Sequence, residues 1–456
     1  KGFPSAALHT VGHAKEIVSK PSGADNKTRL MGIFLSGNYS WDNIFLGDVS
    51  IRFDGSSEFG SNQKWAPFWS GGLGINIHNY GFMQNNGIFN QLKVRASYGQ
   101  TGKVNFPSYS AITTYYFNNW MLNNFGTGVL VSKFGDPNLA WQRTLDKNIG
   151  INLSMFSNRF HVTVDFYHKR TDPLIADIGI PVSMGVEKRR TNIGVQVDKG
   201  VNGTIRYAIL YKPQESINYT MSVNFRYGTA FYKNIGRSLN AYNQENISKN
   251  LTRYYDGGSP TALWAVRSRG IDPATGQEIF VKKDGTLTYT FDYKDEVEVG
   301  DSRPTLEGVW GNTFYYKGWS ASLQLRYSFG ADVFNSTLFN KVENISSRSI
   351  TTNQDRRALY NRWKKPGDKA KFKSISLTES TPMSSRFVMK ENYLSIESVR
   401  LGYQFDSKWL KKALRISSLN INMYMNSIAR FSTLEDERGL YYPFARSISF
   451  SLGAIL

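Results

Sequence analysis

The chain has 456 residues, and its formal net charge of +19 comes from basic residues scattered along the sequence. No helix-turn-helix or RNA-binding sheet signature accompanies them, so we assign this charge to lumen walls, turns and loops and expect no nucleic-acid partner. The absence of cysteine excludes disulfides, thiolate metal sites and a cysteine nucleophile, and no apolar run of about 18 residues suggests a transmembrane helix.

Alternating apolar and polar residues recur along the chain and predict β-strands with one apolar and one polar face. The apolar members, in chain order, are Val49, Ile51 and Phe53; Phe160, Val162, Val164 and Phe166; Met221, Val223, Phe225 and Tyr227; Leu323, Leu325, Tyr327 and Phe329; Leu419, Ile421, Met423 and Met425; Ile448, Phe450 and Leu452. Their polar neighbours include Arg, Asp and Asn, which suit a water-filled lumen better than a sandwich core. The runs span about 10 to 15 residues, near the length of a tilted transmembrane strand.

The connections between about 13 predicted strands alternate between short and long. Tight ones lie at residues 41–43, 157–158, 212–216 and 317–318, and moderately short ones at 80–87 and 406–414. Longer ones lie near 55–65, 102–142, 171–195, 232–306, 331–390 and 430–443. Bacterial barrels have short periplasmic turns and long extracellular loops, so the alternation favours an all-β, transmembrane antiparallel β-barrel over a soluble sandwich with one wet face. The 26 Tyr, 29 Phe and 10 Trp suit the aromatic girdles of such a barrel.

An odd strand count does not close a typical single-chain bacterial barrel, although a short strand hidden in a long loop would change the count by one. Residues 1–4 (KGFP) also lack the features of a signal peptide. We therefore expect residues 27–456 to form the C-terminal portion of a barrel, with its C-terminus at the periplasmic end. Residues 1–26 are expected to be a loop remnant leading into it.

Seven segments carry a resemblance to a known family. They are residues 52–60 (RFDGSSEFG), 65–74 (WAPFWSGGLG), 92–102 (LKVRASYGQTG), 164–171 (VDFYHKRT), 270–276 (GIDPATG), 393–403 (YLSIESVRLGY) and 442–450 (YPFARSISF). In this order they resemble the SusC/RagA family of outer-membrane proteins from Bacteroidetes. The resemblance covers nearly the whole chain from residue 27 onward.

The resemblance implies a barrel of roughly 22 strands, of which this chain supplies about 13, and an N-terminal plug domain that is absent from this chain. It implies import of oligosaccharides or peptides across the outer membrane of a Gram-negative bacterium, without enzymatic activity or a cofactor. The implied partners are a SusD-like surface lipoprotein acting as a lid, the N-terminal barrel and plug segment, and the TonB–ExbB–ExbD system acting through a TonB box on that segment. A passive outer-membrane porin and a structural or docking barrel stay open as alternatives.

The ionisable residues give no catalytic and no metal site. His9 and His13 have the i, i+4 spacing of two metal ligands, but no glutamate follows His9 as a general base. We expect the other polar candidates to be solvated: His161 and His168 on a strand, and Asp295, Glu296, Glu298 and Asp301 in a long loop. Where family members resemble a calcium loop, this chain keeps only Asp284 and Gly285 behind two lysines, which disfavours calcium.

Aromatic residues in the long loops are the candidate contacts of a substrate or a lid. They are Tyr115, Tyr116, Trp120, Tyr254, Tyr255, Trp264, Tyr289 and Tyr293. Aromatic faces stack on sugar rings and fill peptide pockets, while their polar tips tolerate water. The competing interpretation is that these rings only pack the loops on one another.

Overall fold

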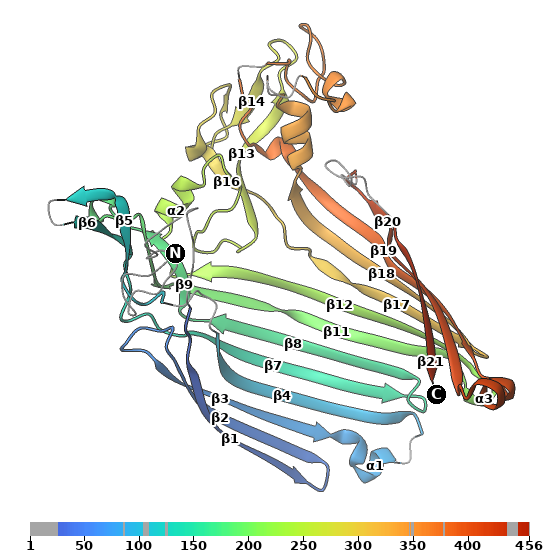
Figure 1. The fold of residues 1–456 in the computed structure, drawn as a ribbon. Helices are drawn as coiled ribbons and strands as arrows, with labels where there is room; N and C mark the ends of the chain where they lie inside the picture. Colours follow the sequence, from blue (N-terminus) through green and yellow to red (C-terminus); the bar gives the residue numbers. More distant parts are fainter. Residues whose placement is uncertain are drawn as a thin grey trace.

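The computed structural model describes residues 26–455, apart from 85–86, 104–108, 124–125, 346, 348–350, 377–378 and 436–445. Within these residues, 13 strands form one sheet in the order β1-β2-β3-β4-β7-β8-β11-β12-β17-β18-β19-β20-β21. Each strand of this sheet pairs antiparallel with the one before and the one after it along the chain. The sheet curves into a wide trough (Figure 1). The predicted all-β fold and its 13 long strands are confirmed.

The sheet is built from long strands. Their bounds are β1 (Leu30–Trp41), β2 (Phe45–Ser56), β3 (Trp65–Asn76), β4 (Phe89–Lys103), β7 (Gln142–Met155), β8 (Phe160–Thr171), β11 (Val195–Lys212), β12 (Ile217–Lys233), β17 (Leu306–Tyr316), β18 (Trp319–Phe334), β19 (Val388–Phe405), β20 (Ser418–Ser432) and β21 (Ile448–Ile455). Most contain 11 to 18 residues, as a tilted strand that crosses a membrane requires.

Short connections gather at one end of the sheet, called here the short-turn end. Among the described residues they hold η2 (Ile77–Asn79), α1 (Gly81–Gln84), η4 (Pro213–Glu215) and α3 (Lys408–Leu414). The tightest link joins β17 to β18, where Lys317 and Gly318 have φ values of 45° and 91°. Two consecutive residues at positive φ match the twist of the flanking strands, which explains the glycine. The chain's last described residue, Ile455, pairs with Ser418 at this same end.

All long connections gather at the opposite end, called here the long-loop end (Figure 1). The described part of these connections contains further short elements that the alternation did not reveal. They are β5 (Thr114–Asn123), β6 (Gly126–Lys133), β9 (Leu174–Gly179), η3 (Val182–Met184), β10 (Lys188–Ile193), α2 (Asn240–Glu245), β13 (Ala262–Ile271), β14 (Glu278–Val281), β15 (Leu287–Thr288), η5 (Tyr293–Asp295), β16 (Glu296–Asp301), η6 (Leu338–Glu343), η8 (Arg356–Leu359) and η9 (Ser385–Phe387). A four-stranded sheet, β15-β14-β13-β16, dominates the β12–β17 connection. The predicted alternation of short and long connections is confirmed.

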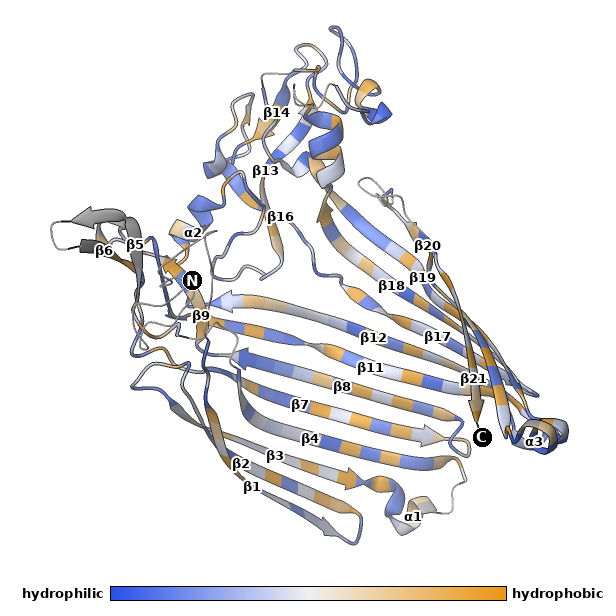
Figure 2. Cartoon of the chain, in the orientation of Figure 1, coloured by the Kyte–Doolittle hydropathy of each residue, from blue (hydrophilic) through white to orange (hydrophobic). Residues whose placement is uncertain are grey.

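The strands carry the expected alternation, which Figure 2 shows as bands of opposite hydropathy along the wall. One side of the sheet, the apolar face, presents residues such as Ile149 and Phe166, both of which are at least half exposed. The other side, the polar face, presents residues such as Arg95 and Asp165. Compact buried clusters lie instead beneath the long loops: Phe59, Ala66, Phe68 and Trp141, and separately Phe339, Val342, Phe372 and Phe387. The wall contributes Ala66 and Phe68, at the start of β3, to the first of these clusters.

The two edge strands of the large sheet are β1 and β21, and the sheet does not close between them. All described residues of both strands are exposed.

Among the described residues, no helix combines the length and the apolar character needed to cross a membrane.

Candidate functional site: the polar face and the long loops

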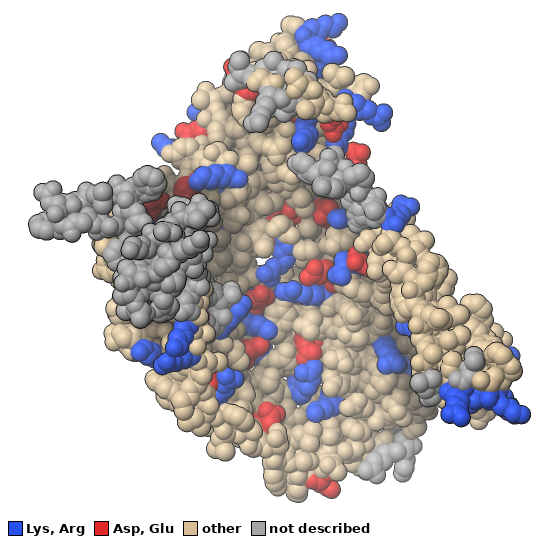
Figure 3. Space-filling view, viewed as in Figure 1, with Lys and Arg blue, Asp and Glu red and all other residues tan. Residues whose placement is uncertain are grey.

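The polar face is lined by ion pairs, most of which join different strands. Figure 3 shows basic and acidic side chains mixed in the hollow of the sheet. The described pairs include Arg52–Asp54 at 2.6 Å, Arg95–Asp165 at 2.7 Å, Lys169–Asp146 at 3.2 Å, Arg226–Glu307 at 3.6 Å, Arg326–Glu397 at 3.4 Å and Arg430–Glu391 at 2.6 Å. Charges of both signs on one face, opposite an apolar face, are the pattern of a water-filled barrel interior.

One of these pairs spans an intervening strand. Arg95 on β4 is the register partner of Gly150 on β7, and Gly150 is the partner of Asp165 on β8. A Cβ at Gly150 would lie 2.5 Å from Asp165 Oδ1, so only glycine leaves room for the two side chains to meet there.

The two strand histidines lie on opposite faces of β8. His161 is on the polar face, with Nδ1 2.8 Å from the Ser154 hydroxyl oxygen. His168 follows seven positions later, and this odd separation places it on the apolar face beside Lys147. In the described part of the chain, no three His, Asp or Glu side chains converge as metal ligands. His9 and His13 lie outside the described residues.

Three of the predicted aromatic contacts come together in the β12–β17 connection. The rings of Tyr255 and Trp264 have centres 4.7 Å apart, and Tyr254 packs against Tyr232 at 5.7 Å and Tyr242 at 5.3 Å. Burial raises the pKa of Tyr254 above its ordinary value. The Trp264 indole nitrogen is buried and has no hydrogen-bond partner among the described residues. These five residues, Tyr232, Tyr242, Tyr254, Tyr255 and Trp264, are called here the aromatic cluster. Its rings pack on one another, and the Tyr255 ring is partly exposed.

Four further predicted aromatic residues, Tyr115, Tyr116, Tyr289 and Tyr293, lie outside this cluster. Tyr289 and Tyr293 are exposed on the β15–β16 side of the small sheet, and Tyr289 donates a hydrogen bond to Asp272 at 2.8 Å. Tyr115 and Tyr116 are exposed on β5, far from β13 along the chain. Trp120 belongs to the same strand, and its side chain lies outside the described residues.

The acidic group of residues 295–301 is not simply solvated. Glu296 accepts two hydrogen bonds from Arg253, at 2.8 and 2.9 Å, and the Arg253 side chain is almost fully buried. Asp301 accepts a hydrogen bond from Thr261 at 2.6 Å. The expectation of solvated carboxylates is therefore wrong for Glu296, because an arginine 43 positions earlier needs it as a buried counter-ion.

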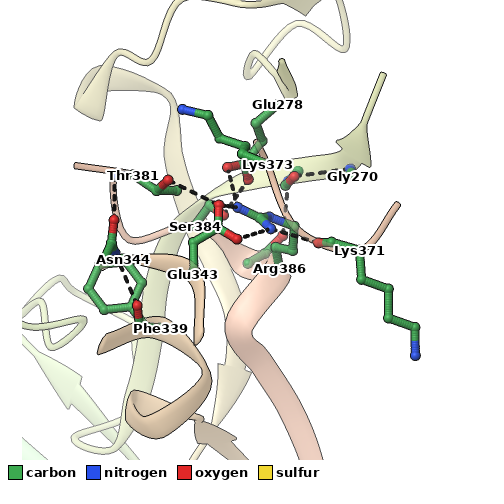
Figure 4. Close-up of polar contacts among 12 residues, drawn as sticks. Gly270, Glu278, Phe339, Glu343, Asn344, Lys371, Lys373, Thr381, Ser384 and Arg386 are labelled. Atoms are coloured by element: carbon green, nitrogen blue, oxygen red, sulfur yellow. Dashed lines mark hydrogen bonds and ion pairs between the residues drawn. The ribbon is translucent and has the colours of Figure 1, made fainter. Parts of the chain in front are cut away.

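A buried ionic network holds the β18–β19 connection against the small sheet (Figure 4). Arg386 donates hydrogen bonds to Glu278 at 3.0 Å and to Glu343 at 2.8 Å. Ser384 and Thr381 donate to the same two carboxylates, at 2.6 and 3.0 Å. The side chains of Glu278 and Glu343 are at most 2 % exposed, so this cluster, Glu278, Glu343, Thr381, Ser384 and Arg386, is a buried brace in which both carboxylates accept hydrogen bonds, while Arg386 Nε has no partner among the described residues.

The segment GIDPATG forms a tight turn that docks on the same connection. Asp272 accepts hydrogen bonds from the Ala274 N–H and the Thr275 and Tyr289 hydroxyls, which lower the pKa of its carboxyl. Gly276 has a φ of +72°, and a Cβ there would lie 2.5 Å from the Trp363 ring. Trp363 in turn donates its indole N–H to the Pro273 carbonyl at 2.8 Å. The carboxylates near this turn are thus occupied by internal donors, and Asp284 likewise accepts from Thr286.

A pocket of about 1040 Å³ opens between the β18–β19 and β20–β21 connections, and sequence reasoning missed it. Basic and aromatic side chains line it, among them Arg356, Arg357, Tyr360, Lys371 and Phe372. Arg357 pairs with Asp355 at 2.6 Å and with Glu435 at 2.9 Å, which ties the two connections together. The Arg356–Arg357 pair close to Tyr360 is the local signal that could have pointed to this pocket.

The sequence matches, over residues 10–422, the family described as TonB dependent receptor-like, beta-barrel. TonB-dependent receptor P39 of Formosa agariphila is 27 % identical, over 95 % of this chain and 45 % of that protein. TonB-dependent receptor SusC of Bacteroides thetaiotaomicron is 24 % identical, over 94 % of this chain and 44 % of that protein. The chain therefore spans less than half the length of these two curated relatives.

Among solved structures, a chain of the RagAB peptide transporter superposes with a TM-score of 0.80 and 22 % identity, covering 95 % of this chain and 47 % of that one. The RagAB peptide importer in its open-open state gives a TM-score of 0.78 and 21 % identity, covering 99 % of this chain and 49 % of that one. At this identity the likeness concerns the fold, and it extends over nearly all of the sheet described above.

Proposed function

The chain belongs to the TonB-dependent receptor-like β-barrel family, and on that premise we propose that it forms the wall and mouth of an active outer-membrane importer. The observation that carries the proposal is the polar face, where charges of both signs line a hollow sheet that is apolar on its other side. Such a wall suits the passage of a hydrated, uncharged or mixed-charge cargo. Oligosaccharides and peptides are the two cargo classes that we propose.

The long-loop end is proposed to be extracellular and the short-turn end periplasmic, because bacterial barrels place their long loops outside the cell. A SusD-like lipoprotein lid over the long loops completes the proposal. Its support is the loop platform, the name used here for the small sheet β15-β14-β13-β16 together with the β18–β19 connection. The buried brace around Arg386 holds these two parts together. Coupling to TonB–ExbB–ExbD would act through a plug segment.

The open edges of the sheet favour an importer over a porin formed by this chain alone. Unpaired backbone groups at β1 and β21 would be costly in lipid, so further strands must pair with both edges. We propose that an N-terminal barrel segment supplies them.

The decisive experiment measures uptake by cells that express the full-length receptor with a SusD-like lipoprotein. Fluorescently labelled mixtures of oligosaccharides and of peptides serve as probes, with and without an intact TonB. For an importer, deletion of TonB should lower the uptake rate by at least about tenfold. Uptake that is equal in both strains identifies a passive porin, and the absence of uptake of either probe in both strains points to a docking barrel; either result overturns the proposal.

A further inference from the structure

A row of basic residues crosses the apolar face of the sheet. It consists of Lys147 on β7, His168 on β8 and Lys199 on β11, all exposed. His168 is the direct register partner of both lysines, so the three side chains lie side by side on adjacent strands. These strands are interior to the sheet, so the row is not an edge at which another strand pairs.

The row marks the boundary of the apolar band on the side of the long-loop end. The next four apolar-face positions on each strand toward the short-turn end carry no charge: Ile149, Ile151, Leu153 and Met155 on β7; Phe160, Val162, Val164 and Phe166 on β8; Val201, Gly203, Ile205 and Tyr207 on β11. Met155 follows Lys147 by eight positions, a span of roughly 26 Å along the strand and roughly 20 Å in height at the usual tilt. The apolar band of a barrel is about 25 Å tall, so the row lies where hydrocarbon meets lipid head groups.

The two lysines of the row keep their charge available. Among the described residues, neither forms an ion pair; Lys147 Nζ lies 5.3 Å from the centre of the Tyr98 ring, and Lys199 Nζ 5.9 Å from that of Phe231. Lys169 offers the contrast. It follows His168 directly but projects on the polar face, where Asp146 neutralises it at 3.2 Å.

An apolar groove of about 740 Å³ opens beside Lys147 on the same face. The small residues Gly71 and Ala96 leave space between the larger side chains of Trp69, Tyr98 and Ile149. A Cβ at Gly71 would meet only the Asp48 carbonyl oxygen, at 3.8 Å, so the space above this glycine is open. The groove thus begins at a free ammonium group and continues along apolar side chains.

We propose that this face binds a phosphorylated lipid of the outer leaflet, with its phosphate on Lys147, His168 and Lys199 and an acyl chain in the groove. Charge complementarity selects the occupant, because an anionic head group and an apolar tail match the cationic row and the groove in the same order. Lysine acts as a point charge toward phosphate, and a neighbouring histidine adds a ring N–H donor. The inference rests on the proposed placement of the long-loop end at the cell surface.

The test uses the full-length receptor in mild detergent, incubated with diphosphoryl lipid A, and counts bound lipid by native mass spectrometry. Removing both charges, in the double variant K147Q/K199Q, is expected to lower lipid retention by about tenfold. Gly71→Leu, which fills the groove without removing charge, is expected to lower it as well. The matched control Lys169→Gln removes one charge from the polar face and keeps wild-type retention.

Two further arms define the ligand. Fully dephosphorylated lipid A should bind the wild type about tenfold more weakly than diphosphoryl lipid A, and inorganic phosphate should not displace the bound lipid. Equal retention by wild type and K147Q/K199Q overturns the site, as does displacement by free phosphate. Loss of a receptor dimer in K147Q/K199Q with unchanged lipid would assign the face to a second copy instead. Since lipid retention is measured without TonB, failure of the uptake assay leaves this result unaffected.

Discussion

Arg95 on β4 donates a hydrogen bond to Asp165 on β8 at 2.8 Å, although β7 runs between the two strands. The contact exists because β7 presents Gly150 at the register position that faces both residues. The two side chains therefore lie over the β7 backbone, and the absence of a side chain at Gly150 is as much a part of the pair as the charges are.

Gly150→Ala should separate this pair. The new Cβ would lie 2.5 Å from Asp165 Oδ1 and 2.8 Å from Arg95 Cζ, so the arginine side chain must move away. The expected loss is about 1 kcal/mol, since Asp165 is partly buried and loses its charged donor. The midpoint of thermal unfolding in detergent reports it. Gly37→Ala on β1 is the control, because its nearest neighbour is an ordinary contact with Val49 at 3.8 Å, and an equal loss there would contradict the explanation.

Arg386→Met should release the long-loop platform from its brace. Glu278 and Glu343 would remain buried without their cation, at a cost of about 3–5 kcal/mol. Faster protease cleavage within residues 335–387, with an intact wall, is the expected observation. Arg267→Met serves as control, because Arg267 is exposed and makes only a 3.5 Å contact with a backbone carbonyl. Protection equal to that of the wild type in Arg386→Met would show that the network carries no stability.

Acid should open the turn at Asp272. Hydrogen bonds hold the pKa of this carboxyl below its ordinary value of 3.8. A depressed pKa means that the ionised form stabilises the turn above the ordinary value, and that this contribution disappears as the pH falls below it. Hydrogen exchange of residues 272–276 should therefore accelerate below pH 3.8 in the wild type. Asp272→Ala should show fast exchange at all pH values; an acid transition that persists in it would assign the effect to another group.

Trp264 and Tyr255 should contribute to lid affinity or substrate uptake through their aromatic rings. Trp264→Ala removes the 4.7 Å ring contact and is expected to lower lid affinity or labelled-substrate uptake by about tenfold. Trp264→Phe keeps an aromatic face and removes an indole nitrogen that has no described partner, so it should behave like the wild type. If both variants leave lid affinity and uptake unchanged, the cluster only packs the loop on itself.

The two faces of β12 should differ sharply in their tolerance of charge. Val223 pairs with Ile205 and Trp310 on the apolar face near mid-strand, and Val223→Arg should cost about 2–4 kcal/mol and impair assembly into the membrane. Asn224→Arg, one position later, places the same charge on the polar face and should assemble normally. Heat-modifiable mobility of the barrel on gels measures assembly, and equal behaviour of the two variants would contradict the assignment of faces.

The wall was predictable from the sequence because strand alternation has a period of two and is readable locally. Residues such as Val223 and Asn224 reveal their faces without knowledge of any partner strand. The resemblance of seven segments, from RFDGSSEFG to YPFARSISF, to the SusC/RagA family is confirmed by the matches to TonB-dependent receptors and to the RagAB fold. The same parity also separates His161 from His168, although the sequence prediction treated both only as solvated.

The loop platform was not predictable for a physical reason. Glu278 and Arg386 are 108 positions apart, and each looks like an ordinary surface charge in its local sequence. Glu296 was misjudged for the same reason, because its partner Arg253 lies in a different element. Of the aromatic candidates, Tyr254, Tyr255 and Trp264 are brought together by the fold of a single connection, whereas Tyr115 belongs to another hairpin. Their roles toward a substrate or a lid stay predictions.

The strand order of the large sheet equals the chain order, and each wall strand is joined by a short turn to one neighbour and pairs with the other along its own length, as β12 and β17 do. The connection of residues 234–305 can then behave as an exchangeable cassette. Its replacement by the corresponding segment of a relative should leave the wall assembled while altering which cargo is accepted. In such a design, selection can diversify recognition quickly while the spanning strands change slowly.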